Sequence, residues 1–128
     1  MAAVESYPEE LLYHPEHDWA SIEDDVAVLG ITWHAQDALG EIVHYEPPPA
    51  GSLIEKDRSY GEVESVKAVS DLIAPLSGQV LEVNQGVIDA PELINEDPYG
   101  EGWLVRIRLT EPLEARQLLD AAAYRATL

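Results

Sequence analysis

The sequence predicts a small β-sandwich or barrel-like sandwich that forms one domain. Three observations support this: short β-prone segments recur along the chain, turn residues separate them, and helical patterns occur only at the margins. A chain of 128 residues can bury a core without covalent staples. No stretch has the composition of a linker, so we expect a loose lead-in over 1–12 and a single domain over 13–128.

The first half of the chain is expected to contain a hairpin, a short helix and a further strand. Residues 19–22 and 26–31 are predicted strands, because β-branched and aromatic residues flank an acidic turn. Thr32 can cap a short helix, and Gly40 can close it in the left-handed conformation. A strand over 42–45 ends at three prolines, since proline lacks the N–H that pairs strands.

The centre of the chain is predicted to form a second hairpin with Lys67 at its tip. Segments 60–65 and 69–73 are short and β-prone, and they pair naturally if the chain reverses between them. A turn over 74–78 then leads into a strand over 80–83, which a polar turn follows.

The last third is predicted to form one strand and a helical tail. Over 103–109 apolar side chains alternate with a second set that includes two arginines, which indicates a half-buried strand with a basic solvent face. Thr110 is a candidate cap for a helix over 112–119, and 121–126 extends or follows that helix.

Composition excludes several classes of protein. The chain has no cysteine, so it has no disulfide framework, no thiolate metal site and no cysteine nucleophile. Its net charge of −18 repels nucleic acid and anionic membranes, and no apolar stretch is long enough to span a bilayer. We therefore expect a soluble, cytoplasmic protein. The acidity either serves solubility or steers the chain towards electropositive protein partners, and both readings stay open.

Histidine patterns that would indicate catalysis or a metal site are weak. His14 and His17 are three residues apart, but a proline lies between them and no third ligand is obvious, so surface histidines are the favoured interpretation. His34 and His44 accompany no nucleophile motif, so a serine–histidine–acid arrangement is not supported. We expect no metal and no histidine-based catalysis.

Acidic patterns give no better indication of an enzyme. Segment 95–100 lacks the alternating ligands and the distal glutamate of a calcium loop, so a turn is expected there. Glu62, Glu64 and Asp71 are candidates for the acid and base pair of a glycosidase. In so acidic a chain, however, these carboxylates are better explained as part of a solvated face. The chain is therefore predicted to be a non-catalytic protein.

The segment Glu64-Ser65-Val66-Lys67-Ala68-Val69-Ser70-Asp71 resembles the lipoylation site of the glycine cleavage system H-protein family. The resemblance covers roughly 13–124, because further landmarks of the family follow in the expected order: His17-Asp18-Trp19, Gly30-Ile31-Thr32, Ala35-Gln36, Leu39-Gly40, Ala74-Pro75, Ser77-Gly78, Glu82-Val83-Asn84 and Asn95 through Trp103.

The resemblance implies a lipoyl/biotinyl-type hybrid β-sandwich with short peripheral helices and a C-terminal helix. It implies that a lipoyl ligase or transferase attaches lipoate to Lys67 through an amide bond. The expected function is to shuttle the aminomethyl group of glycine. The implied partners are a pyridoxal-phosphate glycine decarboxylase, a folate-dependent aminomethyltransferase and dihydrolipoamide dehydrogenase.

The family is also expected to shield the loaded arm in a surface cleft where carboxylates meet the ammonium group. The matching residues here are Glu16, Asp18 and Asp71. Glu64 and Asp71 lie on either side of the lysine, so an alternative role for them is recognition by the lipoylating enzyme. A further interpretation of Glu16, Asp18, Glu64 and Asp71 is that they only make the surface soluble.

The chain departs from the family pattern at three places. Trp33 replaces the usual acidic residue after Gly-Ile-Thr, Asp18 replaces a glutamate, and His44 with the prolines of 47–49 replaces a valine-rich strand end. Trp33 is either a docking aromatic or packs beside the cleft.

These departures leave two alternatives to the glycine shuttle. One is a specialised lipoate carrier of the same fold that serves sulfur oxidation or lipoyl relay. The other is an unmodified acidic protein-binding module, for which Lys67 stays a free amine. Biotin is disfavoured because no methionine flanks Lys67.

Overall fold

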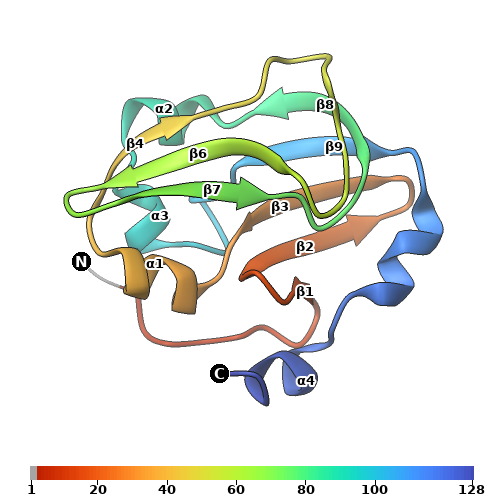
Figure 1. Ribbon diagram of the computed structural model, residues 1–128, viewed down its shortest axis with the longest axis horizontal. Coiled ribbons are helices and arrows are strands. Elements are labelled where there is room, and N and C mark those ends of the chain that lie inside the picture. Colours follow the sequence, from red (N-terminus) through yellow and green to blue (C-terminus); the bar gives the residue numbers. More distant parts are fainter. Residues whose placement is uncertain (1–2) are drawn as a thin grey trace.

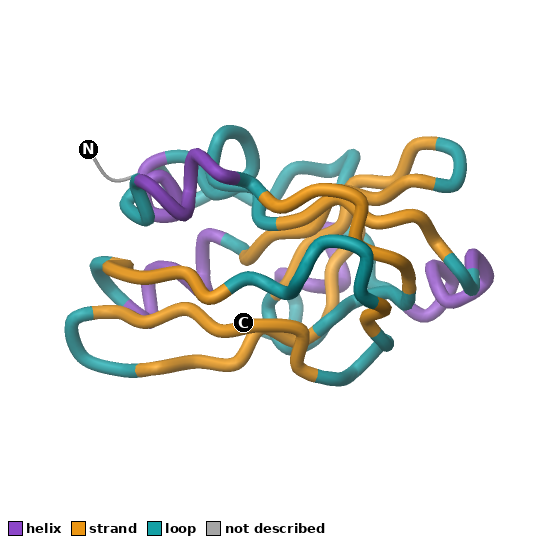
Figure 2. Tube along the Cα trace, turned by 90° about the horizontal axis from the view of Figure 1, so that it is seen from above, coloured by secondary structure: helices purple, strands orange, loops and turns teal. Residues whose placement is uncertain are grey.

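The computed structural model describes residues 3–128 and consists of two antiparallel sheets that pack against each other (Figure 1). The larger sheet has the strand order β1-β2-β3-β9-β8-β5, and the smaller has the order β4-β6-β7. Seen from above, the strands fill the middle of the molecule and most helical segments lie towards its ends (Figure 2). The predicted mainly-β sandwich is confirmed.

The elements have the following bounds. The larger sheet contains β1 (Leu12–His14), β2 (Asp18–Glu23), β3 (Val26–Ile31), β5 (Leu53–Ile54), β8 (Gly78–Val83) and β9 (Val105–Leu109). The smaller sheet contains β4 (Ile42–Glu46), β6 (Ser59–Ser65) and β7 (Val69–Ile73). The helices are α1 (Trp33–Leu39), α2 (Gln85–Asp89), α3 (Leu93–Glu96), the 3₁₀ helix η1 (Pro112–Gln117) and α4 (Ala121–Arg125).

The main core lies between the two sheets. Leu29 and Ile107 from the larger sheet and Tyr45, Val63 and Leu72 from the smaller sheet are all buried in one cluster. Burial of apolar side chains of this size stabilises the fold by about 1.5–3 kcal/mol each. This core fixes the smaller sheet as a rigid layer, with its other face towards solvent.

A second core, the aromatic cluster, joins the beginning of the chain to its end. Its buried members are Tyr7, Leu11, Tyr13, Trp19, Ala121 and Tyr124. The rings of Tyr13 and Tyr124 stack with their centroids 4.8 Å apart. Residues 3–11 of the lead-in, which we expected to be loose, form no helix or strand but contribute two buried side chains, Tyr7 and Leu11, and Leu12 already belongs to β1.

Helix α1 begins and ends where the sequence predicts. The Thr32 side chain accepts a hydrogen bond from the Ala35 N–H at 3.2 Å and so caps the helix. Gly40 closes it with φ of 82°, a conformation that side chains disfavour, while its N–H donates to the Gln36 carbonyl at 2.9 Å. Both hairpins, β2–β3 and β6–β7, also form as predicted.

Several local predictions are wrong. The polar turn expected after the strand over 80–83 is instead the start of α2. Asn84 caps this helix, because its side chain accepts a hydrogen bond from the Gly86 N–H at 3.0 Å. Helix α3 occupies part of the turn expected over 95–100. Thr110 caps nothing: η1 follows Glu111 without a side-chain cap, and Asp120 caps α4 separately. These helices have four to six residues, too few for a hydrophobic period to reveal them.

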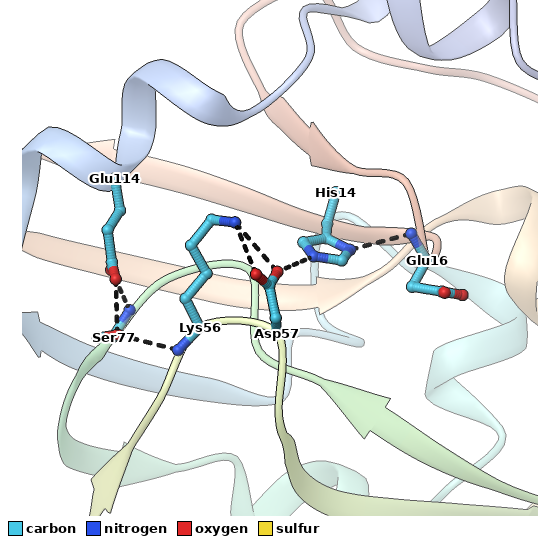
Figure 3. A network of polar contacts seen from close by, with 6 residues as sticks. All are labelled: His14, Glu16, Lys56, Asp57, Ser77 and Glu114. Carbon is cyan, nitrogen blue, oxygen red and sulfur yellow. Dashed lines mark hydrogen bonds and ion pairs between the residues drawn. The ribbon is translucent and has the colours of Figure 1, made fainter.

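His14 is buried, contrary to the expectation of a surface histidine, and it anchors the loop before β6 (Figure 3). Its Nδ1 accepts from the Glu16 N–H at 3.0 Å, so Nε2 carries the proton and donates to Asp57 Oδ1 at 2.7 Å. This bond, followed by that from Lys56, lowers the pKa of Asp57. Asp57 has φ of 71°, and the contacts hold it there.

No helix among residues 3–128 combines the length and the apolar character that crossing a bilayer requires. The same residues contain no group of three or more histidine, aspartate or glutamate side chains arranged to hold a metal ion.

Candidate functional site

Lys67 lies exposed at the tip of the β6–β7 hairpin, as the sequence predicts, and this hairpin reaches the edge of the molecule (Figure 1). The turn is held from inside by Ser65, whose N–H donates to the Ala68 carbonyl at 2.7 Å. The Ser65 hydroxyl oxygen accepts from the N–H groups of Lys67 at 3.3 Å and Ala68 at 3.1 Å. The backbone at Lys67 is therefore ordered although its side chain faces solvent.

The two lysines of the chain have different surroundings. Lys56 is mostly covered, and its Nζ lies 3.0 Å from Asp57 Oδ1 (Figure 3). Lys67 is exposed and makes no ion pair within 4.0 Å in the part of the chain that the structure describes. Of the two amines, only that of Lys67 is presented for an enzyme to reach.

The hairpin tip rests on the link between α1 and β4. The Val66 N–H donates to the Glu41 carbonyl at 3.0 Å. A Cβ atom at Gly40 would lie 3.7 Å from Lys67 Cε, so the end of the lysine stem lies near this glycine. The position of the tip therefore depends on how firmly residues 40–41 are held.

Asn95 of α3 holds that link, a role that sequence reasoning missed. Its Oδ1 accepts from the Ile42 N–H at 2.9 Å. Its Nδ2 donates to Gln36 Oε1 at 3.0 Å and to the Gly40 carbonyl at 2.9 Å. One amide thus ties both ends of the segment on which the lysine hairpin rests, and only an asparagine side chain of this length offers both the acceptor and the two donors.

A pocket of about 380 Å³ lies beside this link, between α1 and α3. None of the acidic residues that the sequence singled out lines it. Its lining consists of Gln36, Asp37, Gly40, Glu41, Glu92, Asn95 and Glu96.

The predicted acidic residues lie in different environments. Glu64 and Asp71 are exposed on β6 and β7, on either side of Lys67 in the chain. Asp71 Oδ1 accepts from the Ser59 hydroxyl at 3.4 Å. Glu16 is exposed in the β1–β2 turn, whereas Asp18 next to it is buried at 2% exposure.

Asp18 is the most unusual of these carboxylates. Among the residues that the structure describes, its buried Oδ2 has no hydrogen-bond partner, and neither has the buried Tyr60 hydroxyl. Burial, followed by the charge of Glu16, raises the pKa of Asp18 well above its ordinary value. Burial, followed by Asp18, likewise raises the pKa of Tyr60. A buried carboxylate without a partner is a group for which a cation would supply the missing contact.

Replacing Asp18 by asparagine should stabilise the protein at neutral pH but not at acid pH. The folded state raises the pKa of this carboxyl, so its ionisation disfavours folding increasingly as pH rises above about 4. Asp18→Asn should therefore raise the free energy of unfolding by about 1–3 kcal/mol at pH 7 and leave it nearly unchanged near pH 4. Urea unfolding across this pH range measures the difference. A pH-independent difference would contradict the assignment.

Trp33 and His44, which depart from the family pattern, have separate roles. The Trp33 indole N–H donates to the Ala3 carbonyl at 2.9 Å, and its backbone N–H donates to the Tyr99 hydroxyl. Trp33 therefore packs against the lead-in and is half-buried, so it is not a freely exposed aromatic. His44 is exposed on β4, with its Nε2 3.1 Å from Glu46 Oε2.

His17 and His34 form a ring pair at the start of α1, with centroids 4.6 Å apart. Burial, followed by the neighbouring His34, lowers the pKa of His17. His17 Nδ1 lies 2.7 Å from the Tyr124 hydroxyl, which in turn lies 2.8 Å from Thr32 Oγ1. The pair therefore belongs to the contacts that hold α4 against the cap of α1.

Comparisons with known proteins agree with the geometry of the hairpin. The family model described as "Glycine cleavage H-protein" matches residues 11–128. The chain is 50% identical over 119 residues to the glycine cleavage system H protein of Symbiobacterium thermophilum, with 93% of each chain covered. It is 51% identical over 118 residues to that of Synechococcus sp. (strain JA-3-3Ab), with 92% of each covered.

A solved structure is similar to the whole fold. The crystal structure of a glycine cleavage system H protein from Mycobacterium marinum matches with a TM-score of 0.85 and 41% sequence identity. The match covers 93% of this chain and 96% of that one.

Proposed function

Because the chain belongs to the glycine cleavage H-protein family, we propose that it carries lipoate on Lys67 and shuttles the aminomethyl group of glycine between enzymes. The observation that carries the assignment to Lys67 is the contrast between the two lysines. Lys56 is covered and paired with Asp57, whereas Lys67 is exposed on an ordered tip.

The residues around Lys67 suit the attachment of a long arm. The hydrogen bonds of Ser65 hold the backbone of the tip, and the small side chain of Ala68 leaves the lysine accessible. Lipoate would supply a disulfide that accepts the aminomethyl group together with electrons. A tethered arm reaches effective concentrations on the order of millimolar at a docked partner, so the group need not diffuse freely.

The four acidic residues fit two tasks in this proposal. Glu64 and Asp71 are exposed beside Lys67, where an attaching ligase or transferase can contact them. Glu16, Asp18 and Asp71 are proposed to meet the ammonium of a loaded arm. The unpartnered Oδ2 of Asp18 supports this, because an ammonium would supply the partner that this buried oxygen lacks.

The expected enzyme partners follow from membership of the glycine cleavage system. They are the pyridoxal-phosphate glycine decarboxylase, the aminomethyltransferase and dihydrolipoamide dehydrogenase. In this division of labour the carrier performs no catalysis. The curated relatives described above are named as glycine cleavage system H proteins, which favours the glycine shuttle over a sulfur-oxidation or lipoyl-relay carrier.

A peptide mass spectrum of the protein isolated from its native host tests the proposal. We expect a lipoyl adduct on the peptide that contains Lys67 and none on the peptide that contains Lys56. An unmodified Lys67, in cells whose other lipoyl proteins carry their adducts, would instead support an unmodified acidic binding module. Assay with glycine decarboxylase then separates the glycine shuttle from a specialised carrier.

A further inference from the structure

Tyr60 of β6 carries a buried hydroxyl that the fold leaves unpaired. The residue is 7% exposed and belongs to the main core. Within residues 3–128, only two buried side-chain atoms have no hydrogen-bond partner, the Tyr60 hydroxyl and Asp18 Oδ2. Burying a hydroxyl without a partner destabilises a fold, so a phenylalanine would serve the core better at this position. The hydroxyl therefore needs an explanation other than packing.

The two unpaired atoms face the same interior from opposite sheets. Side chains alternate along a strand, so Asp18 shares the face of Ala20 and Ile22, and both of these pack in the main core. Tyr60 enters that core from the smaller sheet. Burial, and then the charge of Asp18, raises the pKa of Tyr60. The two groups thus lie near each other, although no hydrogen bond joins them.

The pair lies at the rim of the core, where solvent is near. Asp18 is the first residue of β2, and the exposed Glu16 precedes it by two positions. Tyr60 directly follows the exposed Ser59, whose hydroxyl donates to Asp71 Oδ1 at 3.4 Å. Glu16 and Asp71 are the exposed carboxylates proposed above to meet the loaded arm. Each of them therefore lies close to one member of the buried pair.

A primary ammonium group matches this arrangement. It carries one positive charge and three N–H donors, so it can bind a carboxylate and a neutral acceptor at the same time. The carboxylate of Asp18 supplies the opposite charge. Because its pKa is raised, the phenol of Tyr60 stays neutral at physiological pH, and its oxygen can accept a hydrogen bond.

We propose that the Tyr60 hydroxyl is a further contact of the aminomethyl cargo, accepting a hydrogen bond from the ammonium group whose charge Asp18 meets. This inference rests on the function proposed above, and it adds a residue that favours a hydrogen-bonding cargo over an apolar one. The unloaded chain gives up some stability, and the loaded arm is held more firmly in return. A docked arm is kept from water, which otherwise hydrolyses it to a thiol, formaldehyde and ammonium.

The test compares Tyr60→Phe with Tyr45→Phe, a matched control from the same sheet and the same core. The Tyr45 hydroxyl is also buried, but it donates to the Leu104 carbonyl at 3.1 Å. The melting temperatures of the unmodified chains are measured first. Tyr60→Phe should raise the melting temperature by roughly 2–4 °C, because an unpaired hydroxyl is removed, whereas Tyr45→Phe should lower it, because a carbonyl loses its donor.

Each chain is then lipoylated, loaded from glycine by a purified glycine decarboxylase and separated from that enzyme. Release of formaldehyde from the isolated loaded chain measures how well the arm is shielded. We expect Tyr60→Phe to release formaldehyde roughly tenfold faster than the parent, as expected for the loss of a hydrogen bond to a charged group, and Tyr45→Phe to match the parent. With 13C-labelled tyrosine, the ring-carbon NMR signal of Tyr60 should also shift on loading, while that of Tyr45 stays in place.

Faster release together with a raised melting temperature supports the contact, because a merely structural hydroxyl would not move the two in these directions. Unchanged release, an unmoved Tyr60 signal or equal acceleration in both variants would overturn it. A lower melting temperature of Tyr60→Phe would do the same, since it would show that a bound water already satisfies the hydroxyl. Failure of the proposed function is distinguishable: the parent chain would then take up no lipoate at Lys67, or no aminomethyl group from glycine.

Discussion

Replacing Lys67 by arginine should abolish lipoate attachment completely while leaving the fold intact. Arginine keeps the positive charge and the length of the side chain, but its guanidinium does not form the amide that the ligase makes with an amine. The side chain at Lys67 is exposed, so the free energy of unfolding should change by less than about 0.5 kcal/mol. Intact mass after incubation with ligase, lipoate and ATP gives the result directly.

Lys56→Arg is the matched control, because Lys56 is the only other lysine in the chain. Its ion pair with Asp57 can be kept by arginine, so this variant should be modified as fully as the parent chain. Modification of the Lys67→Arg protein, or its loss in Lys56→Arg, would show that the acceptor lysine had been assigned to the wrong residue.

Replacing Asn95 by alanine should have two effects, one on global stability and one on the lysine hairpin. Three hydrogen bonds would be lost, which leaves the Ile42 N–H and the Gly40 carbonyl without their partner. Losses of this kind destabilise a protein by about 2–4 kcal/mol in total. Because the Val66 N–H bonds to the Glu41 carbonyl within that segment, its hydrogen exchange should also accelerate.

Asn84 offers a control of the same chemistry at another place. Its Nδ2 donates to the carbonyls of Glu101 and Trp103, and its Oδ1 accepts from the Gly86 N–H. Asn84→Ala should therefore lose similar global stability but leave the hydrogen exchange of the Val66 N–H unchanged. If both variants alter Val66 equally, Asn95 supports the fold in general and has no particular role in positioning Lys67.

Local patterns in the sequence were sufficient to predict the two hairpins and α1. Alternation and turn chemistry act over a few residues, and the Thr32 and Gly40 caps lie directly beside the helix that they delimit. The same reasoning placed Lys67 on an exposed tip, because the strands on either side of it are regular. β1 and β5, by contrast, have three and two residues and exist only through pairing with β2 and β8.

The features that were missed depend on contacts between distant parts of the chain. Asn95 is 53 residues from Ile42, and His14 is 43 residues from Asp57. No local period indicates that these side chains meet. The burial of Asp18 is of the same kind, since an aspartate at the start of a strand is ordinarily expected at the surface.

The aromatic cluster also has a consequence for how the chain acquires its structure during synthesis. Tyr124 must be present for the contacts with Tyr13 and His17, and 107 residues separate it from His17. The ribosome synthesises α4 only after the strands of both sheets, because α4 follows all of them in the sequence. The cluster therefore closes only after both sheets have been synthesised, and until then the growing polypeptide presents Tyr7, Tyr13 and Trp19 without α4 over them.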